Sequence, residues 1–117
     1  MIIVESLSRS EIKEEGMYIY SYRMTKGDIT LSTEDSSIEV QSYGIEVERQ
    51  DLLNGVVVNI ERDSLKSISS QRHKVHNLLR VLYEGKVSPI HFIDIIGEHV
   101  DSYIEDFEDN FYSIATN

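Results

Sequence analysis

Two neighbouring segments decide the fold of this chain: SQRHKVHNLLRVLYE at residues 70–84 and SPIHFIDIIGEHVDSYIEDFEDNF at residues 88–111. In the first segment, apolar residues follow the i, i+3, i+4, i+7 spacing of one buried helix face: Val75, Leu78, Leu79 and Leu82. The second segment repeats apolar residues at similar helical spacing. Because only a few residues separate the segments, they predict an antiparallel helical hairpin over residues 69–114.

The flanking residues predict where these helices begin and end. Ser69 or Ser70 can cap the first helix, and Gly85 suits the position after its last turn. Ser88 then caps the second helix, with Pro89 as its first residue, where the missing N–H costs nothing. In this interpretation the second helix reaches residue 112.

The chain before the hairpin, residues 1–66, predicts mainly strands. Residues 17–25 alternate most clearly, with four large side chains on one side: Tyr18, Tyr20, Tyr22 and Met24. The charged residues 9–15 indicate a connection that is partly strand. Gly27 and its polar neighbours Lys26 and Asp28 predict a turn, after which residues 29–32 return as a partner strand.

Two further glycines mark features of the later strands. The apolar alternation changes sides near Gly44, which predicts a bend or bulge there. Asn54 and Gly55 predict a type I′ hairpin turn. We therefore expect one α+β domain over residues 1–117: an antiparallel sheet of about four or five strands, followed by a C-terminal two-helix hairpin packed on one face.

Composition limits the classes of function. The 117 residues contain no cysteine, which excludes disulfides, thiol catalysis and cysteine-ligated zinc. No apolar run approaches the ~20 residues that span a bilayer, and the first residues do not resemble a signal peptide. We expect a cytoplasmic protein without a membrane partner.

Charge is unevenly distributed along the chain. The net charge is −10, which disfavours nucleic acid and anionic membranes as partners. Residues 62–86 nevertheless contain six Lys or Arg and two acidic residues, whereas residues 87–117 contain seven acidic residues and no Lys or Arg. The predicted first helix is therefore basic and the second acidic, so the two helices can satisfy each other's charges.

Several segments resemble a family of short proteins of unknown function from clostridia and related anaerobic bacteria. These segments are QSYGIEVERQD at residues 41–51, VNIERD at 58–63, QRHKVHNLL at 71–79 and VSPIH at 87–91. The resemblance implies a bacterial cytosolic origin. It implies no activity, ligand or site residue.

The strand face formed by Tyr18, Tyr20 and Tyr22 is one candidate binding surface. Three aromatic rings on one face can stack on a ligand, although core packing with the hydroxyls at the rim is favoured. The outcome depends on which sheet face the helices cover. A second candidate is the acidic stripe of the second helix, represented by Asp101, Glu105 and Glu108.

Histidines offer a weaker candidate. His73 and His76 on the first helix, with His91 and Asp94 on the second, provide metal-ligating groups. Their spacing matches no known metal motif, and surface histidines explain them more simply. We therefore predict no metal site and no cofactor.

Three classes of function remain open. A non-catalytic protein-interaction or regulatory module, binding another protein or a second copy of itself, is favoured. A small-molecule or metal-binding enzyme would use the histidines and carboxylates of the hairpin, but the sequence contains no phosphate loop, nucleophile elbow or cysteine nucleophile. A nucleic-acid binder would use Arg72, Lys74 and Arg80, against the acidic balance of the chain.

Overall fold

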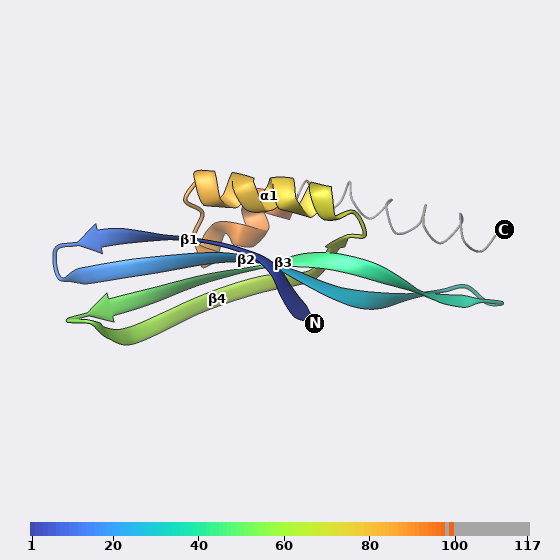
Figure 1. Cartoon of the computed structure of the whole chain (residues 1–117), viewed down its shortest axis with the longest axis horizontal. Coiled ribbons are helices and arrows are strands. Elements are labelled where there is room, and N and C mark those ends of the chain that lie inside the picture. Colours follow the sequence, from blue (N-terminus) through green and yellow to red (C-terminus); the bar gives the residue numbers. More distant parts are fainter. Residues whose placement is uncertain (98, 100–117) are drawn as a thin grey trace.

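Long strands form one antiparallel sheet in the computed structural model, which describes residues 1–97 and 99 (Figure 1). The described strands follow the sheet order β1-β2-β3-β4: β1 (Ile2–Lys13), β2 (Gly16–Ser32), β3 (Ser37–Leu53) and β4 (Val56–Ser69). Helix α1 (Arg72–Glu84) follows, and the 3₁₀ turn η1 (Pro89–His91) leads into helical residues 92–97. The predicted α+β class, antiparallel sheet and C-terminal helices on one face are confirmed.

The two central strands determine the length of the molecule. Strands β2 and β3 contain 17 residues each, which corresponds to about 58 Å at ~3.4 Å per residue. The longest dimension of the structure is 59 Å. The helices cover only part of this length, so the β2–β3 hairpin extends past them at one end of Figure 1.

One predicted turn is wrong. The chain continues through Gly27 as part of β2, where Gly27 pairs with Ser42, and the actual turn comes after Ser32. There the backbone N–H of Thr33 donates to the carbonyl oxygen of Ser36 at 2.8 Å. Glycine tolerates extended backbone as well as turns, and the long antiparallel pairing with β3 decides between the two. Residues 9–13, expected in a connection that is partly strand, all belong to β1.

Two other glycine predictions are confirmed. Asn54 and Gly55 have φ values of 53° and 78°, as a type I′ turn between β3 and β4 requires. The β3–β4 register shifts between Tyr43 and Ile45, which is the irregularity predicted at Gly44. A Cβ atom on Gly44 would lie 2.2 Å from the carbonyl oxygen of Leu65, so the close approach of β4 requires glycine.

The ends of α1 differ from the prediction in detail. Gln71 occupies the N-cap position, and the Ser69 hydroxyl accepts a hydrogen bond from the Gln71 N–H at 3.0 Å. Gly85 keeps a right-handed φ of −81°, and Lys86 takes the left-handed conformation, with φ of 54°. The predicted helix end is therefore correct within a residue, but Lys86 rather than Gly85 adopts the left-handed conformation after the helix. Ser88 and Pro89 start the next element as predicted.

The core lies between the helices and one face of the sheet. Tyr22 and Ile45 from the sheet, Leu79 from α1, and Phe92 and Ile96 from the following helical residues are all fully buried. Alternation along β2 and β3 places these sheet residues on the same side as the helices. None of the described helices lies over the opposite side of the sheet (Figure 1).

We predict that Gly44→Ala lowers the free energy of unfolding by at least about 2 kcal/mol, because the added methyl group would overlap the backbone of β4. Urea denaturation measures this loss. Gly27→Ala is the matched control, since nothing lies within 4 Å of a Cβ at that strand position. Equal stability losses in the two variants would contradict the close approach at Gly44.

Candidate functional site

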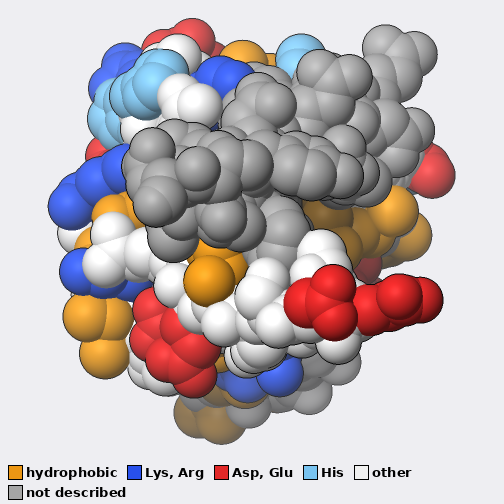
Figure 2. Space-filling model, turned by 90° about the vertical axis from the view of Figure 1, so that its right-hand side faces the viewer, with side chains coloured by type: hydrophobic (Ala, Val, Ile, Leu, Met, Phe, Trp, Pro, Cys, Tyr) orange, Lys and Arg blue, Asp and Glu red, His pale blue; other side chains and the backbone are white. Residues whose placement is uncertain are grey.

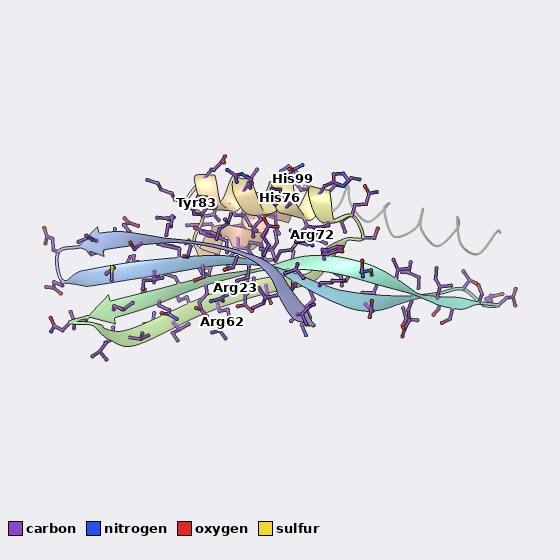
Figure 3. All side chains as sticks on the ribbon, viewed as in Figure 1. Arg23, Arg62, Arg72, His76, Tyr83 and His99 are labelled. Carbon is purple, nitrogen blue, oxygen red and sulfur yellow. The ribbon has the colours of Figure 1, made fainter. Side chains whose placement is uncertain are left out.

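The side of the sheet away from the helices presents an ordered set of side chains, which we call the open face. Cross-strand pairing aligns these residues in rows that run across all four strands. From the β1–β2 turn inward, the rows are Ile12, Met17, Leu52 and Val57; Ser10, Ile19, Gln50 and Ile60; Ser8, Ser21, Glu48 and Arg62; and Ser6, Arg23, Glu46 and Ser64. Figure 3 shows Arg23 and Arg62 on the side of the sheet opposite α1.

The two rows nearest the turns form an apolar end of the open face: Ile12, Met17, Ile19, Leu52, Val57 and Ile60. Ile12 is 85% exposed and Ile60 is 49% exposed, while Met17, Ile19 and Leu52 are half-buried by their neighbours. Isolated exposed apolar residues are ordinary on protein surfaces, but a contiguous group contributed by every strand is a candidate interaction surface.

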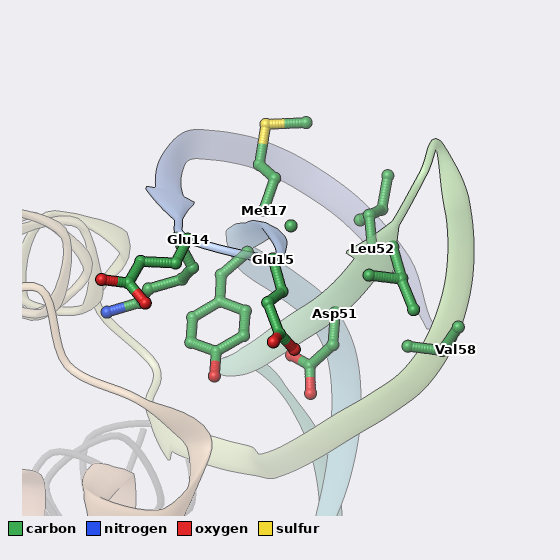
Figure 4. Close-up of a pocket in the computed structure, with 10 residues that line it drawn as sticks. Glu14, Glu15, Met17, Asp51, Leu52 and Val58 are labelled. Atoms are coloured by element: carbon green, nitrogen blue, oxygen red, sulfur yellow. The ribbon is translucent and has the colours of Figure 1, made fainter.

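A depression of about 590 Å³ lies beside this apolar end, between the β1–β2 and β3–β4 turns (Figure 4). Its apolar walls include Met17, Leu52 and Val58, and its polar walls include Glu15 and Asp51. The surface at the turns is therefore hollowed as well as apolar. A protruding side chain from a partner protein fits such a depression.

The next two rows form an ionic band: Arg23, Glu46, Glu48 and Arg62. Glu48 is only 2% exposed, yet its carboxylate accepts hydrogen bonds from Arg23 at 3.2 Å, from the Arg62 Nε at 2.8 Å and from the Gln50 amide at 3.2 Å. Arg23 also donates to Glu46 at 2.7 Å. Two arginines and two glutamates thus neutralise one another across three strands.

The ionic band changes the acidity of its buried member. Burial opposes the ionisation of Glu48, but hydrogen bonds from Arg23 and Arg62 outweigh it, so the pKa of the Glu48 carboxyl is lowered below its ordinary value. Glu48 is therefore a charged structural residue at neutral pH. Its proton affinity is the reverse of what a general acid near neutral pH requires.

The tyrosine strand face lies under the helices rather than at the surface. Tyr22 is fully buried, Tyr20 is 6% exposed, and the Tyr22 hydroxyl donates to the Val87 carbonyl oxygen at 2.8 Å. Burial raises the pKa of that hydroxyl. Core packing, the favoured interpretation of these residues, agrees with this burial, and a partner-binding role for Tyr20 or Tyr22 gains no support from it.

Cationic side chains cover the part of the tyrosine face that extends beyond the helices. The Arg9 guanidinium lies 4.0 Å from the centroid of the Tyr20 ring, and the Arg49 guanidinium lies 4.7 Å from that of Tyr18. Lys13 approaches Tyr18 from 5.3 Å. These cation–π contacts leave the Tyr18 ring partly buried and already occupied.

The histidine candidates are dispersed. His76 Nδ1 lies 2.6 Å from a Glu5 carboxylate oxygen on β1, and His73 and Arg72 line the same shallow depression. In Figure 2, histidine, Lys and Arg side chains gather at one corner of the molecule. His91 and Asp94 are exposed near η1. Within residues 1–97 and 99, no group of three or more His, Asp or Glu side chains could hold a metal ion.

Several charged residues of the basic segment have partners among the described residues. Arg62 pairs with Glu48 on β3 and His76 with Glu5 on β1, while Arg80 pairs with Glu84 within α1 at 3.0 Å. The expected neutralisation by the acidic second helix stays a prediction, because most of its acidic residues are outside the described part of the chain. Three residues of that acidic stripe lie outside the described residues: Asp101, Glu105 and Glu108.

Sequence reasoning did not single out the open face. The alternation that marked the tyrosines also separates Met17, Ile19, Ser21 and Arg23 onto the other side of β2. The sequence alone does not give the register of the strands. Only the pairing of all four strands shows that the apolar residues of the open face share two rows. The register also brings Glu48 to Arg62 and Arg49 to Glu61 as ion pairs across β3 and β4.

The acid sensitivity of folding tests the ionic band. Because the folded pKa of Glu48 is lowered, its stabilisation is present above the unfolded pKa and is lost as pH falls through the folded value. Glu48→Gln should lower the free energy of unfolding by about 1–3 kcal/mol at pH 7, since Arg62 is partly exposed. The difference from wild type should shrink as pH falls below 4.5, the ordinary glutamate value, toward the lowered pKa of the folded state.

Denaturation by urea across this pH range measures the effect. Glu39→Gln is the control, because Glu39 is an exposed β3 residue away from the ionic band. A Glu48→Gln deficit that stays constant from pH 7 to about pH 3 would rule out the charged state as its cause.

Comparison with known proteins identifies the family of the chain. Residues 1–102 match the family of unknown function DUF6514, and the chain belongs to that family. Neither the curated proteins nor the solved structures contain a significant match. None of the helices in the described part of the chain has the length and apolar content needed to span a bilayer.

Proposed function

We propose that this member of the DUF6514 family is a non-catalytic protein-interaction module and that its open face is the binding surface. The observation that carries the proposal is the apolar end, where every strand contributes an apolar residue to the row nearest the turns. Following the resemblance to clostridial-type proteins, we place this module in the bacterial cytoplasm.

The geometry supports an interaction in two ways. The apolar end and the adjoining depression supply the kind of core that desolvated anchor residues occupy at interfaces. The neighbouring ionic band and serine side chains supply a polar rim, with Arg62 55% exposed at its border. A hydrophobic centre beside a polar border is the ordinary anatomy of a protein–protein interface.

The other two functions receive less support from the described residues. The metal-binding enzyme would need converging ligands, and His73 and His76 lie near α1's start whereas His91 and Asp94 lie near η1. The nucleic-acid binder would use Arg72 and Arg80, but Arg72 donates to the Val4 carbonyl oxygen and Arg80 to Glu84. The acidic stripe of Asp101, Glu105 and Glu108 remains a second candidate surface.

Site-specific photocrosslinking tests the proposal. A photoreactive amino acid at Ile60, in the source cells, should yield covalent adducts with protein, including a second copy of this chain, because Ile60 lies in the apolar end. The same residue at Val81 is the control, since Val81 is 48% exposed, similar to Ile60 at 49%, but lies on α1. Adducts should be absent or several-fold weaker there. Equal yields at both positions, or none at Ile60, would contradict the proposed surface.

A further inference from the structure

We infer that the open face binds the open face of a second copy of this chain, which gives a symmetric dimer with the two sheets packed together. The inference rests on the proposed function, because it names the partner of the same surface. It follows from the charges and the row order of the open face, considered in turn.

The charge of this face does not oppose self-association. Each chain carries a net charge of −10, so two copies repel one another on average. The open face differs, because its charged residues are two arginines and two glutamates that already pair with each other: Arg23, Arg62, Glu46 and Glu48. Two copies can therefore meet through this neutral surface without the repulsion that their net charges impose.

The row order is also self-complementary. Consider a two-fold axis that runs parallel to the strands, midway between the two sheets and level with the gap between β2 and β3. Rotation about this axis lays each row over the same row of the second copy. It also places β1 opposite β4 and β2 opposite β3. In the row nearest the turns, this places Ile12 opposite Val57 and Met17 opposite Leu52 of the other copy, so apolar side chains cover apolar side chains. In the next row, Ile60 lies opposite Ser10 and Ile19 opposite Gln50, so no charged residue faces an apolar one there.

The same axis arranges the ionic band without repulsion. Arg23 of one copy lies opposite Glu46 of the other, and Arg62 lies opposite Ser8. Glu48 lies opposite Ser21, so no charged residue of the four rows directly faces a like charge. Such complementarity is what an interface between identical surfaces requires.

The area predicts a reversible dimer. Four rows extend about 27 Å along the strands and four strands extend about 19 Å across, which gives a footprint of roughly 500 Å² per copy. A typical stable interface buries about 800 Å² per partner. The dimer should therefore dissociate on dilution, and we expect both species over a micromolar concentration series.

Sedimentation of the purified full chain tests the dimer. Wild type should change from monomer to dimer as its concentration rises, and Ile60→Lys should weaken association at least about tenfold, because it places an unpaired charge in the apolar end. Val81→Lys adds the same charge on α1 and should associate as wild type does. A monomer at every concentration, or equal effects of the two variants, would overturn the inference.

Chemical crosslinking tests the arrangement, since the chain has no cysteine of its own. In aligned sheets about 10 Å apart, position 12 faces position 57 of the other copy, whereas two positions 12 lie about 17 Å apart. With a crosslinker of about 10 Å reach, a mixture of Ile12→Cys and Val57→Cys proteins should give dimers, and each protein alone should give several-fold fewer. Equal yields would overturn this register.

These outcomes are distinguishable from failure of the proposed function. If photocrosslinking at Ile60 captures only other proteins while the purified chain stays monomeric, the open face is a binding surface but the second copy is not its occupant. If Ile60 captures nothing, the proposed surface itself fails.

Discussion

The packing of the helical layer on the tyrosine side of β2 is the constraint on which the rest of the structure depends. Tyr22 contributes a fully buried ring and a hydroxyl that donates to the Val87 carbonyl oxygen, between α1 and η1. Leu79 and Phe92 complete the contact. Because a strand alternates its side chains, burying Tyr22 commits Arg23 and Ile19 to the opposite side. The choice of core face therefore also creates the open face.

The open face differs in character along its length. In the ionic band, Glu48 is buried but receives hydrogen bonds from two arginines, which stabilise its charge in place of water. Nearer the turns, apolar residues of the open face such as Ile12 and Ile60 have no cover from the described chain. A neutral, partly apolar surface on a chain of net charge −10 is the feature that most directly points to a protein partner.

Local patterns predicted the elements of this fold better than their pairing. Helical spacing identified α1, and Asn54 with Gly55 identified a turn, because both signals act between near neighbours. The turn predicted at Gly27 is wrong, because a glycine within a strand cannot be distinguished from a glycine in a turn until the partner strand is known. The open face could not be predicted for the same reason. Met17, Leu52 and Val57 are on three different strands, and only the register of two strand pairs places them in one row.

The described helices cover one face of the sheet, and no described element covers the other. Isoleucine methyl NMR with a soluble paramagnetic agent, at a concentration where the chain is monomeric, measures this most directly. The structure predicts strong broadening of Ile12 and Ile60 and protection of Ile45, Ile68 and Ile96, which are at most 1% exposed. Protection of Ile60 together with broadening of Ile45 would contradict the assignment of the two faces.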